Sequence, residues 1–232
     1  MSPSATSFLT IHSTYTSVSL GIFTGETEQA SISFDHKTAC AVSLAHLEAL
    51  LVSQDKTLRD LSFIAVNQGP GPYTTLRITL SLADGLSFAS GIPLVGVDGF
   101  AAFVQEISDA RYDYTVILLN AFCHELFYAI RARDGGQMIT GYDSIAACVE
   151  LLNGLGPASV LLAGNGVPLL EAEVKLAMVP MITRISPFRE TPSRQAVARL
   201  AAELWQQGVT SRQLLPLYLK RPNYRTSATP AS

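Results

Sequence analysis

A glycine- and proline-rich segment, residues 67–78, stands between an apolar run and a helix-like stretch, where a turn could hold an anion. Backbone N–H groups and the dipole at a helix N-terminus both attract phosphate. However, Pro70 and Pro72 each remove one N–H donor, and neither the Walker pattern nor G-x-G-x-x-G is present. These features favour a rigid structural turn, and an anion site stays open as the alternative. Thr74 or Thr75 is expected to cap the following helix.

Cysteines and histidines are the other residues that could do chemistry. The three cysteines show no C-x-x-C spacing, and we expect them to be reduced structural thiols. The four histidines form no H-E-x-x-H pattern, so we expect no metal and no cofactor. Cys123 and His124 are adjacent in the chain, but neighbouring side chains on a strand point to opposite faces. A nucleophile and base pair of the kind used by peptidases is therefore disfavoured.

The composition indicates a globular protein that does not grip nucleic acid by itself. Its formal net charge is -3, whereas phosphate binding depends on clustered Lys and Arg. Charged residues make up 15% and hydrophobic residues 48%, so some apolar surface is expected to be reserved for a partner. The N-terminus has no signal-like run and the chain has no long apolar stretch, so we expect a cytoplasmic protein without a membrane segment.

The elements that must position these residues form two similar series. The first half has predicted strands at 8–13, 17–23 and 29–34, a helix at 38–53, a strand at 63–66, a helix from 74 to about 91, a strand at 93–97 and a helix at 99–107. The second half has predicted strands at 115–119, 126–131 and 137–140, a helix at 143–152, a strand at 160–163 and a helix at 193–207. Both halves begin strand, strand, strand, helix, strand, helix.

This repetition predicts an α/β protein with the duplicated plan of the actin-like ATPase and sugar-kinase (ASKHA) superfold, in which each lobe has a mixed β-sheet flanked by helices. We expect an N-terminal lobe over residues 1–108 that carries the partner-binding helices, a C-terminal lobe over 109–220, and a flexible tail over 221–232. A superfold of this kind hosts many chemistries, so individual residues must decide the function.

The glycine-rich segment resembles the G-P-G-S-F-T-G-L-R-I-G signature of the TsaB (YeaZ) family. The residues of this signature loop are Gly69, Pro70, Gly71, Tyr73, Thr74 and Arg77. The resemblance extends over nearly the whole chain, through the opening at residues 9–14, the turn at 164–166, the helix at 192–202 and the closing segment at 216–220. It implies the fold predicted above.

Two departures from the family pattern bear on catalysis. His12 and Asn120 stand where the family has aspartates, at the turns that hold magnesium and the attacking water in the superfold. A neutral imidazole and an amide do not supply the anionic oxygens that magnesium prefers. The helix at 38–53 also contains His46 without the second histidine that binds metal in the paralogue TsaD. We therefore expect no catalytic activity from the chain alone.

Two helices of the first half point to a binding role, because they are apolar on more than one side. The candidate partner-binding residues are Ala41, Leu44, Ala45, Ala49, Leu76, Leu80, Leu82, Ala83 and Leu86. The pattern does not show which face is turned outward, and an entirely intrachain core is the alternative. The resemblance implies that these helices pair with the equivalent two of TsaD in a four-helix interface.

The resemblance also implies the function. The chain is expected to be a non-catalytic subunit that binds and activates TsaD for threonylcarbamoyl transfer to adenosine next to the tRNA anticodon. A TsaE-like ATPase would join a larger complex, tRNA would be held mainly through that complex, and the free chain could form a homodimer. The alternative is a divergent actin-like nucleotide-binding ATPase or kinase that acts alone, which measurable binding of nucleotide and magnesium would distinguish.

Overall fold

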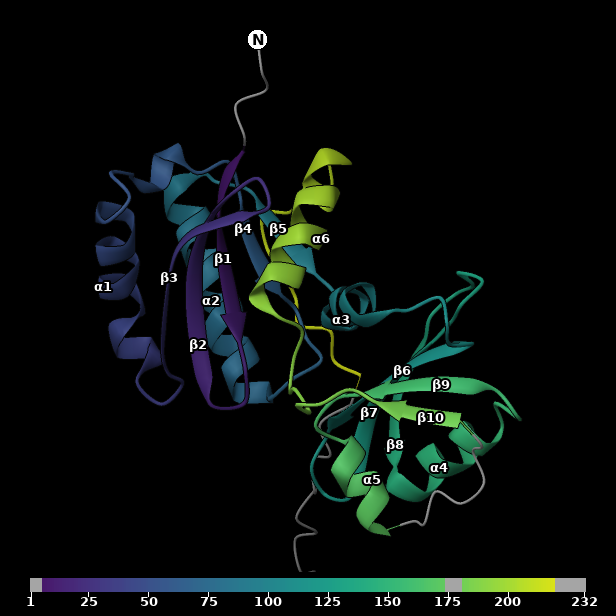
Figure 1. Cartoon of the computed structure of the whole chain (residues 1–232). Coiled ribbons are helices and arrows are strands. Elements are labelled where there is room, and N and C mark those ends of the chain that lie inside the picture. Colours follow the sequence, from purple (N-terminus) through teal and green to yellow (C-terminus); the bar gives the residue numbers. More distant parts are fainter. Residues whose placement is uncertain (1–5, 174–180, 220–232) are drawn as a thin grey trace, which may run out of the picture.

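The computed structural model describes residues 6–173 and 181–219 and shows two lobes, each built on a mixed β-sheet (Figure 1). The first sheet has the order β3-β2-β1-β4-β5. Its strands are β1 (Ser7–Ser13), β2 (Ser17–Thr24), β3 (Thr27–Asp35), β4 (Ile64–Asn67) and β5 (Leu94–Val97). Strand β1 pairs antiparallel with β2 and parallel with β4.

The second sheet repeats this order as β10-β9-β6-β7-β8. Its strands are β6 (Tyr114–Asn120), β7 (Glu125–Ala132), β8 (Ile139–Ser144), β9 (Ser159–Ala163) and β10 (Met181–Arg184). Strand β6 pairs antiparallel with β7 and parallel with β9, as β1 does with β2 and β4. The predicted duplication of a mixed-sheet unit is confirmed.

The helices that accompany the sheets are α1 (Ala39–Val52), α2 (Tyr73–Ser90), α3 (Gly99–Ile107), α4 (Ile145–Asn153), α5 (Val167–Glu173) and α6 (Arg194–Gln206), with a 3-10 turn at Leu58–Asp60. The sequence reasoning missed α5 and β10. It also placed the third strand of the second half about two residues early and began the next helix at Asp143, whereas α4 begins at Ile145. Among the described residues, no helix is long and apolar enough to cross a membrane.

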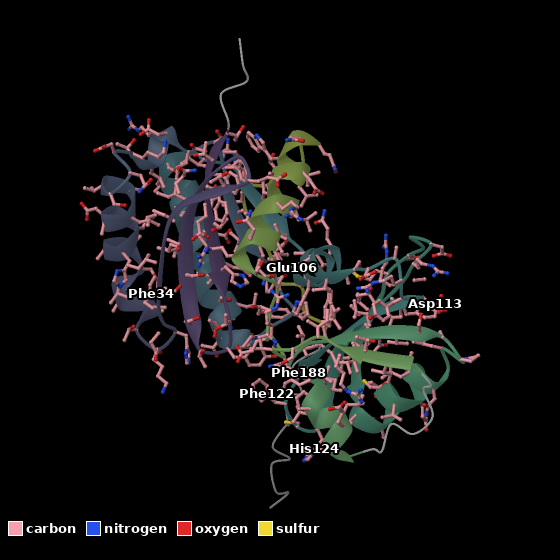
Figure 2. The ribbon with its side chains drawn as sticks, viewed as in Figure 1. Phe34, Glu106, Asp113, Phe122, His124 and Phe188 are labelled. Atoms are coloured by element: carbon pink, nitrogen blue, oxygen red, sulfur yellow. The ribbon has the colours of Figure 1, made fainter. Side chains whose placement is uncertain are left out.

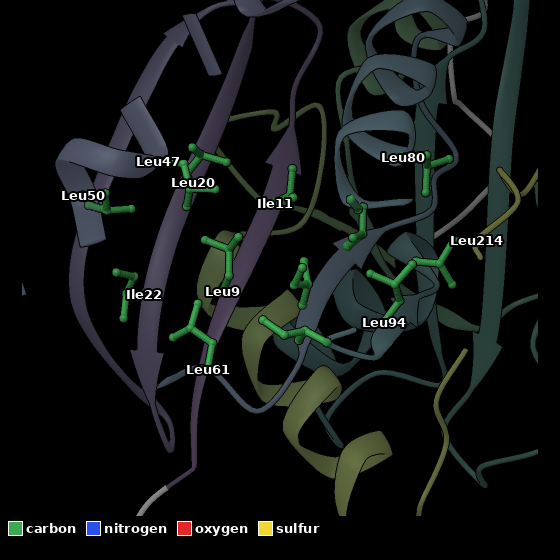
Figure 3. Close-up of a cluster of buried hydrophobic side chains, with 14 of the residues drawn as sticks. Leu9, Ile11, Leu20, Ile22, Leu47, Leu50, Leu61, Leu80, Leu94 and Leu214 are labelled. Atoms are coloured by element: carbon green, nitrogen blue, oxygen red, sulfur yellow. The ribbon is translucent and has the colours of Figure 1, made fainter. Parts of the chain in front are cut away.

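The first sheet is buried on both faces because apolar residues occupy both sides of its central strands. Leu9 and Ile11 of β1 belong to a cluster with Leu47 of α1 and Leu80 of α2 (Figure 3). On the opposite face, the ring of Phe8 stacks on that of Phe63 with centroids 4.3 Å apart. Helices α1 and α2 therefore pack on one face of the sheet, and another element packs on the opposite face.

The element on the opposite face is α6, which comes from the far end of the chain. Its Trp205 ring stacks on Phe63 at 4.9 Å, and Val197 and Ala201 complete the same cluster. Ser211 then forms a bridge with Leu94 at the edge of β5. The boundaries predicted above assign residues 193–220 to the second lobe, whereas α6 and the segment after it pack on the first sheet. Residues 220–232, which include the predicted tail, lie outside the described part of the chain.

Candidate functional site

The glycine-rich loop is built into the fold as the support of α2. Asn67 Oδ1 accepts from the Gly69 N–H at 3.0 Å, and the Gly69 carbonyl accepts from the Gly99 N–H at 2.7 Å. Gly69 has a φ of +108°, and a Cβ there would meet Leu76 Cδ1 at 2.9 Å, so a side chain fits poorly. These polar groups of the loop thus form hydrogen bonds within the lobe, as is typical of a structural turn.

The expected hydroxyl cap of α2 is not formed. The N-cap residue is Pro72, without a side-chain capping bond, so the prediction for Thr74 or Thr75 is wrong. Thr75 is instead buried within the first turn of α2, and its carbonyl accepts from the buried Thr79 hydroxyl at 3.3 Å. The proline fixes the entry of the helix without needing a hydroxyl, because its backbone geometry suits the position before a first turn.

One side of α1 and one side of α2 pack into the core of the lobe. Leu47, Leu50 and Leu51 of α1 belong to the core cluster on this face of the sheet. Leu76, Leu80 and Ala83 of α2 belong to the same cluster and are 3%, 3% and 0% exposed. These three α2 residues, which the sequence analysis predicts to bind a partner, face their own sheet.

The opposite sides of the two helices expose apolar residues. Leu44 and Val52 of α1 are 64% and 67% exposed, and Phe88 of α2 is 93% exposed. The α1–α2 face, as used from here on, consists of Ala41, Leu44, Ala45, Ala49 and Val52 of α1 and Ile78, Leu82, Gly85, Leu86, Phe88 and Ala89 of α2, all exposed or half-buried. It includes six of the nine candidate residues.

Val52 and Phe88 were missed as site residues by sequence reasoning. The signal that could have found Val52 is its spacing of eight residues from Leu44, which places both on one stripe of a helix. Phe88 lies on the stripe of the exposed Ser81 and Gly85, where a phenylalanine is out of place on a surface in contact with water. Both signals depend on knowing which stripe faces outward.

A groove of about 500 Å³ lies between the N-terminal halves of α1 and α2. Its walls are mainly apolar and include Leu44, Ile78 and Leu82, and Tyr73 and Arg77 also line it. The segment that follows α6 reaches this region, because the Gln68 side-chain amide donates to the Leu215 carbonyl at 2.7 Å and the Tyr218 ring stacks on Tyr73 at 5.2 Å. The groove is therefore lined by α1 and α2, and the segment after α6 contacts one of its lining residues, Tyr73.

His12 and Asn120, which the sequence analysis expects to supply no carboxylate to magnesium, both contact other groups of the chain. The His12 Nε2 lies 3.2 Å from the Thr191 hydroxyl, and the Asn120 Oδ1 accepts from the Phe122 N–H at 2.8 Å. Burial of His12, with a smaller contribution from Arg194, lowers its pKa to about 4, so the imidazole is neutral at pH 7. Within residues 6–173 and 181–219, no cluster of three His, Cys, Asp or Glu residues could hold a metal ion.

Tyr15 connects the two turns that carry these residues across the lobes. Its hydroxyl donates to the Asn120 carbonyl, its N–H donates to Glu190 Oε2 at 2.8 Å, and its ring lies 5.6 Å from that of Phe122. Figure 2 shows Phe122 near the junction of the lobes, with Glu106 of α3 also between them. Burial, together with the nearby Glu190 carboxylate, raises the pKa of the Tyr15 hydroxyl and keeps it protonated as a donor.

The buried His12 predicts an acid-sensitive fold. Because its pKa is about 4 in the folded state and about 6.5 in the unfolded chain, the unfolded state binds a proton first as the pH falls. Stability present above pH 6.5 is expected to decline between pH 6.5 and 4 by roughly 3 kcal/mol in total. Urea unfolding at a series of pH values measures this loss.

His12→Asn should flatten the dependence of stability on pH, whereas His36→Gln, at a half-exposed histidine, should keep it. Equal slopes of stability against pH for all three proteins would contradict the assignment of the loss to His12.

Comparison with known proteins gives a family and a fold. The family model for TsaD, tRNA N6-adenosine threonylcarbamoyltransferase, matches residues 41–222. An uncharacterized protein of Mycobacterium tuberculosis is 32% identical over 182 residues, which are 78% of this chain and 74% of that protein. The tRNA threonylcarbamoyladenosine biosynthesis protein TsaB of Buchnera aphidicola is 25% identical over 99 residues, 42% of this chain and 47% of that protein.

Solved structures agree with the predicted architecture. YeaZ from Pseudomonas aeruginosa has a TM-score of 0.68 at 20% identity, covering 92% of this chain and 100% of that chain. A Bacteroides thetaiotaomicron protein with an actin-like ATPase fold has a TM-score of 0.50 at 9% identity, covering 85% of this chain and 96% of that chain. The predicted two-lobed actin-like fold is confirmed.

Proposed function

We propose that this chain, which belongs to the TsaD family of tRNA N6-adenosine threonylcarbamoyltransferases, is the non-catalytic, TsaB-like subunit of a TsaD-like enzyme. The family match supports a role in forming threonylcarbamoyladenosine in tRNA. In this role the chain docks on the TsaD-like protein through the α1–α2 face and activates it for transfer to the adenosine next to the anticodon.

The observation that carries the proposal is the exposure of the α1–α2 face. Leu44, Val52 and Phe88 present large apolar side chains to water on adjoining helices. Large apolar side chains exposed on neighbouring helices favour an interaction site, because covering them removes hydrocarbon from water. The small residues Ala41, Ala45 and Gly85 beside them let partner helices approach closely. A paralogue with the same two helices would meet this face with a matching one.

The role is proposed as non-catalytic because of the neutral residues at the magnesium turns. His12 and Asn120 bring no carboxylate, and Tyr15 binds the second turn. These contacts give less support to the alternative of an ATPase or kinase acting alone. A TsaE-like ATPase and tRNA are proposed to join through the complex in the cytoplasm, since the net charge of -3 suits a subunit that does not hold tRNA by itself.

Co-expression with the TsaD-like protein of the same genome tests the proposal. We expect a stable heterodimer by light scattering after gel filtration, and threonylcarbamoyladenosine formation only when this chain, the TsaD-like protein and the remaining components are combined. The chain alone should hydrolyse no ATP. Its mass in the same light-scattering experiment shows whether the free chain is a monomer or a homodimer. Failure to form a complex, or nucleotide turnover by the chain alone that a substitution in it removes, would contradict the proposal.

A further inference from the structure

The groove between α1 and α2 is apolar along most of its walls but contains one cation, Arg77. Arg77 is an exposed residue on the outward side of α2. Among the described residues, no carboxylate lies within salt-bridge distance of it, in contrast to Arg194, which pairs with Glu28 at 2.8 Å, and Arg189, which pairs with Glu106 at 2.8 Å. The guanidinium therefore retains donors for a group that the described part of the chain does not provide.

The position of this guanidinium is fixed by aromatic neighbours. Its Cζ lies 5.1 Å from the centre of the Tyr73 ring, and its Nη1 donates to the Tyr73 hydroxyl at 3.0 Å. The Tyr73 ring in turn stacks on Tyr218, whose segment is tied to the lobe by the Leu217 N–H donating to the Gln68 carbonyl at 2.9 Å. An arginine held in this way loses less side-chain freedom on binding than a free one.

Resting on the proposed function, we infer that Arg77, in the groove between α1 and α2, determines partner specificity by binding a carboxylate of the TsaD-like protein. Arginine pairs with carboxylates in a bidentate geometry, and its charge matters more once the surrounding apolar groove has been closed. A partner that covers Leu44 and Leu82 also covers the approach to Arg77, because all three line the same groove. It must then either pair the guanidinium or leave a cation desolvated, which is costly.

Binding kinetics at several salt concentrations test this inference on the full chain and the purified TsaD-like protein. Arg77→Ala is expected to weaken binding about tenfold and to flatten the decline of the association rate with salt, because the attraction that guides the encounter is lost. Arg77→Lys should retain the salt dependence but not the full affinity. Tyr73→Phe, which keeps the ring and removes the hydroxyl, should have a smaller effect than Arg77→Ala.

Arg199→Ala provides the matched control, since Arg199 is an exposed arginine on α6, on the opposite face of the sheet. It should bind like the unaltered chain at every salt concentration. If the unaltered chain binds and Arg77→Ala shows the same affinity and salt dependence, the role of Arg77 is overturned while the docking proposal stands. If the unaltered chain does not bind the TsaD-like protein at all, both are overturned.

Discussion

Replacing Leu44 by glutamate is expected to leave the fold intact and to weaken binding of the TsaD-like protein by at least about 100-fold. Leu44 is 64% exposed in the free chain, so a carboxylate there is solvated and costs the monomer little. In the complex the same carboxylate would be dehydrated among apolar side chains, and it would compete with the partner's carboxylate for Arg77, the one cation among the described residues that line this groove. Such a charge costs about 3–5 kcal/mol, which corresponds to roughly 100- to 4000-fold in affinity.

The measurement is calorimetric or interferometric titration with the TsaD-like protein, beside circular dichroism and thermal melting of each variant. Leu44→Ala should have a milder effect, because it removes contact area without adding a charge. Val209→Glu is the matched control, since Val209 is an exposed apolar residue that follows α6 and lies outside the α1–α2 face. Unchanged affinity for Leu44→Glu would show that the partner contacts another surface.

Replacing Ala83 by glutamate is expected to unfold the chain rather than to affect the partner alone. Ala83 is 0% exposed and lies in the cluster with Leu76 and Leu80. A glutamate there both overfills the packed interface between α2 and the sheet and places a charge in it without a partner. The combined cost of several kcal/mol is a large part of the 5–15 kcal/mol that typically separates folded from unfolded domains.

Thermal melting and urea unfolding measure this loss. Gly85→Glu is the matched control, because it introduces the same side chain two residues further along α2 at an exposed position, and a Cβ there meets no heavy atom within 4 Å. We expect Gly85→Glu to melt close to the unaltered chain. A cooperative native-like melt for Ala83→Glu would mean that α2 does not face the sheet in the way described.

The contrast between Leu44 and Ala83 shows what the sequence could and could not predict. The periodic apolar residues and the turn at 67–72 predict both helices to within a few residues. Neither helix carries a marked polar side, however, so its own pattern does not decide which residues face inward. Packing on the sheet decides it, and that packing depends on strands that come from distant parts of the chain.

The same limit applies to the parts of the site that were not foreseen. Tyr15 contacts Asn120, 105 residues away, and His12 contacts Thr191, 179 residues away. Local propensity carries no information about pairs at such separations. The expectation that His12 and Asn120 supply no carboxylate to magnesium depends on residue type alone, so it needed no structure. The role of Tyr15 in joining the two turns required the structure.

The return of α6 to the first lobe has a consequence for the newborn chain. Every strand of the first sheet has been made once Val97 is synthesised, but Trp205, which stacks on Phe63, comes more than a hundred residues later. Until then the aromatic face formed by Phe8, Phe23 and Phe63 lacks its helix while the whole second lobe is being translated. Exposed surface of this kind favours aggregation during synthesis. We therefore expect the nascent first lobe to be prone to aggregation until α6 has been made, and a chain interrupted before α6 to stay so.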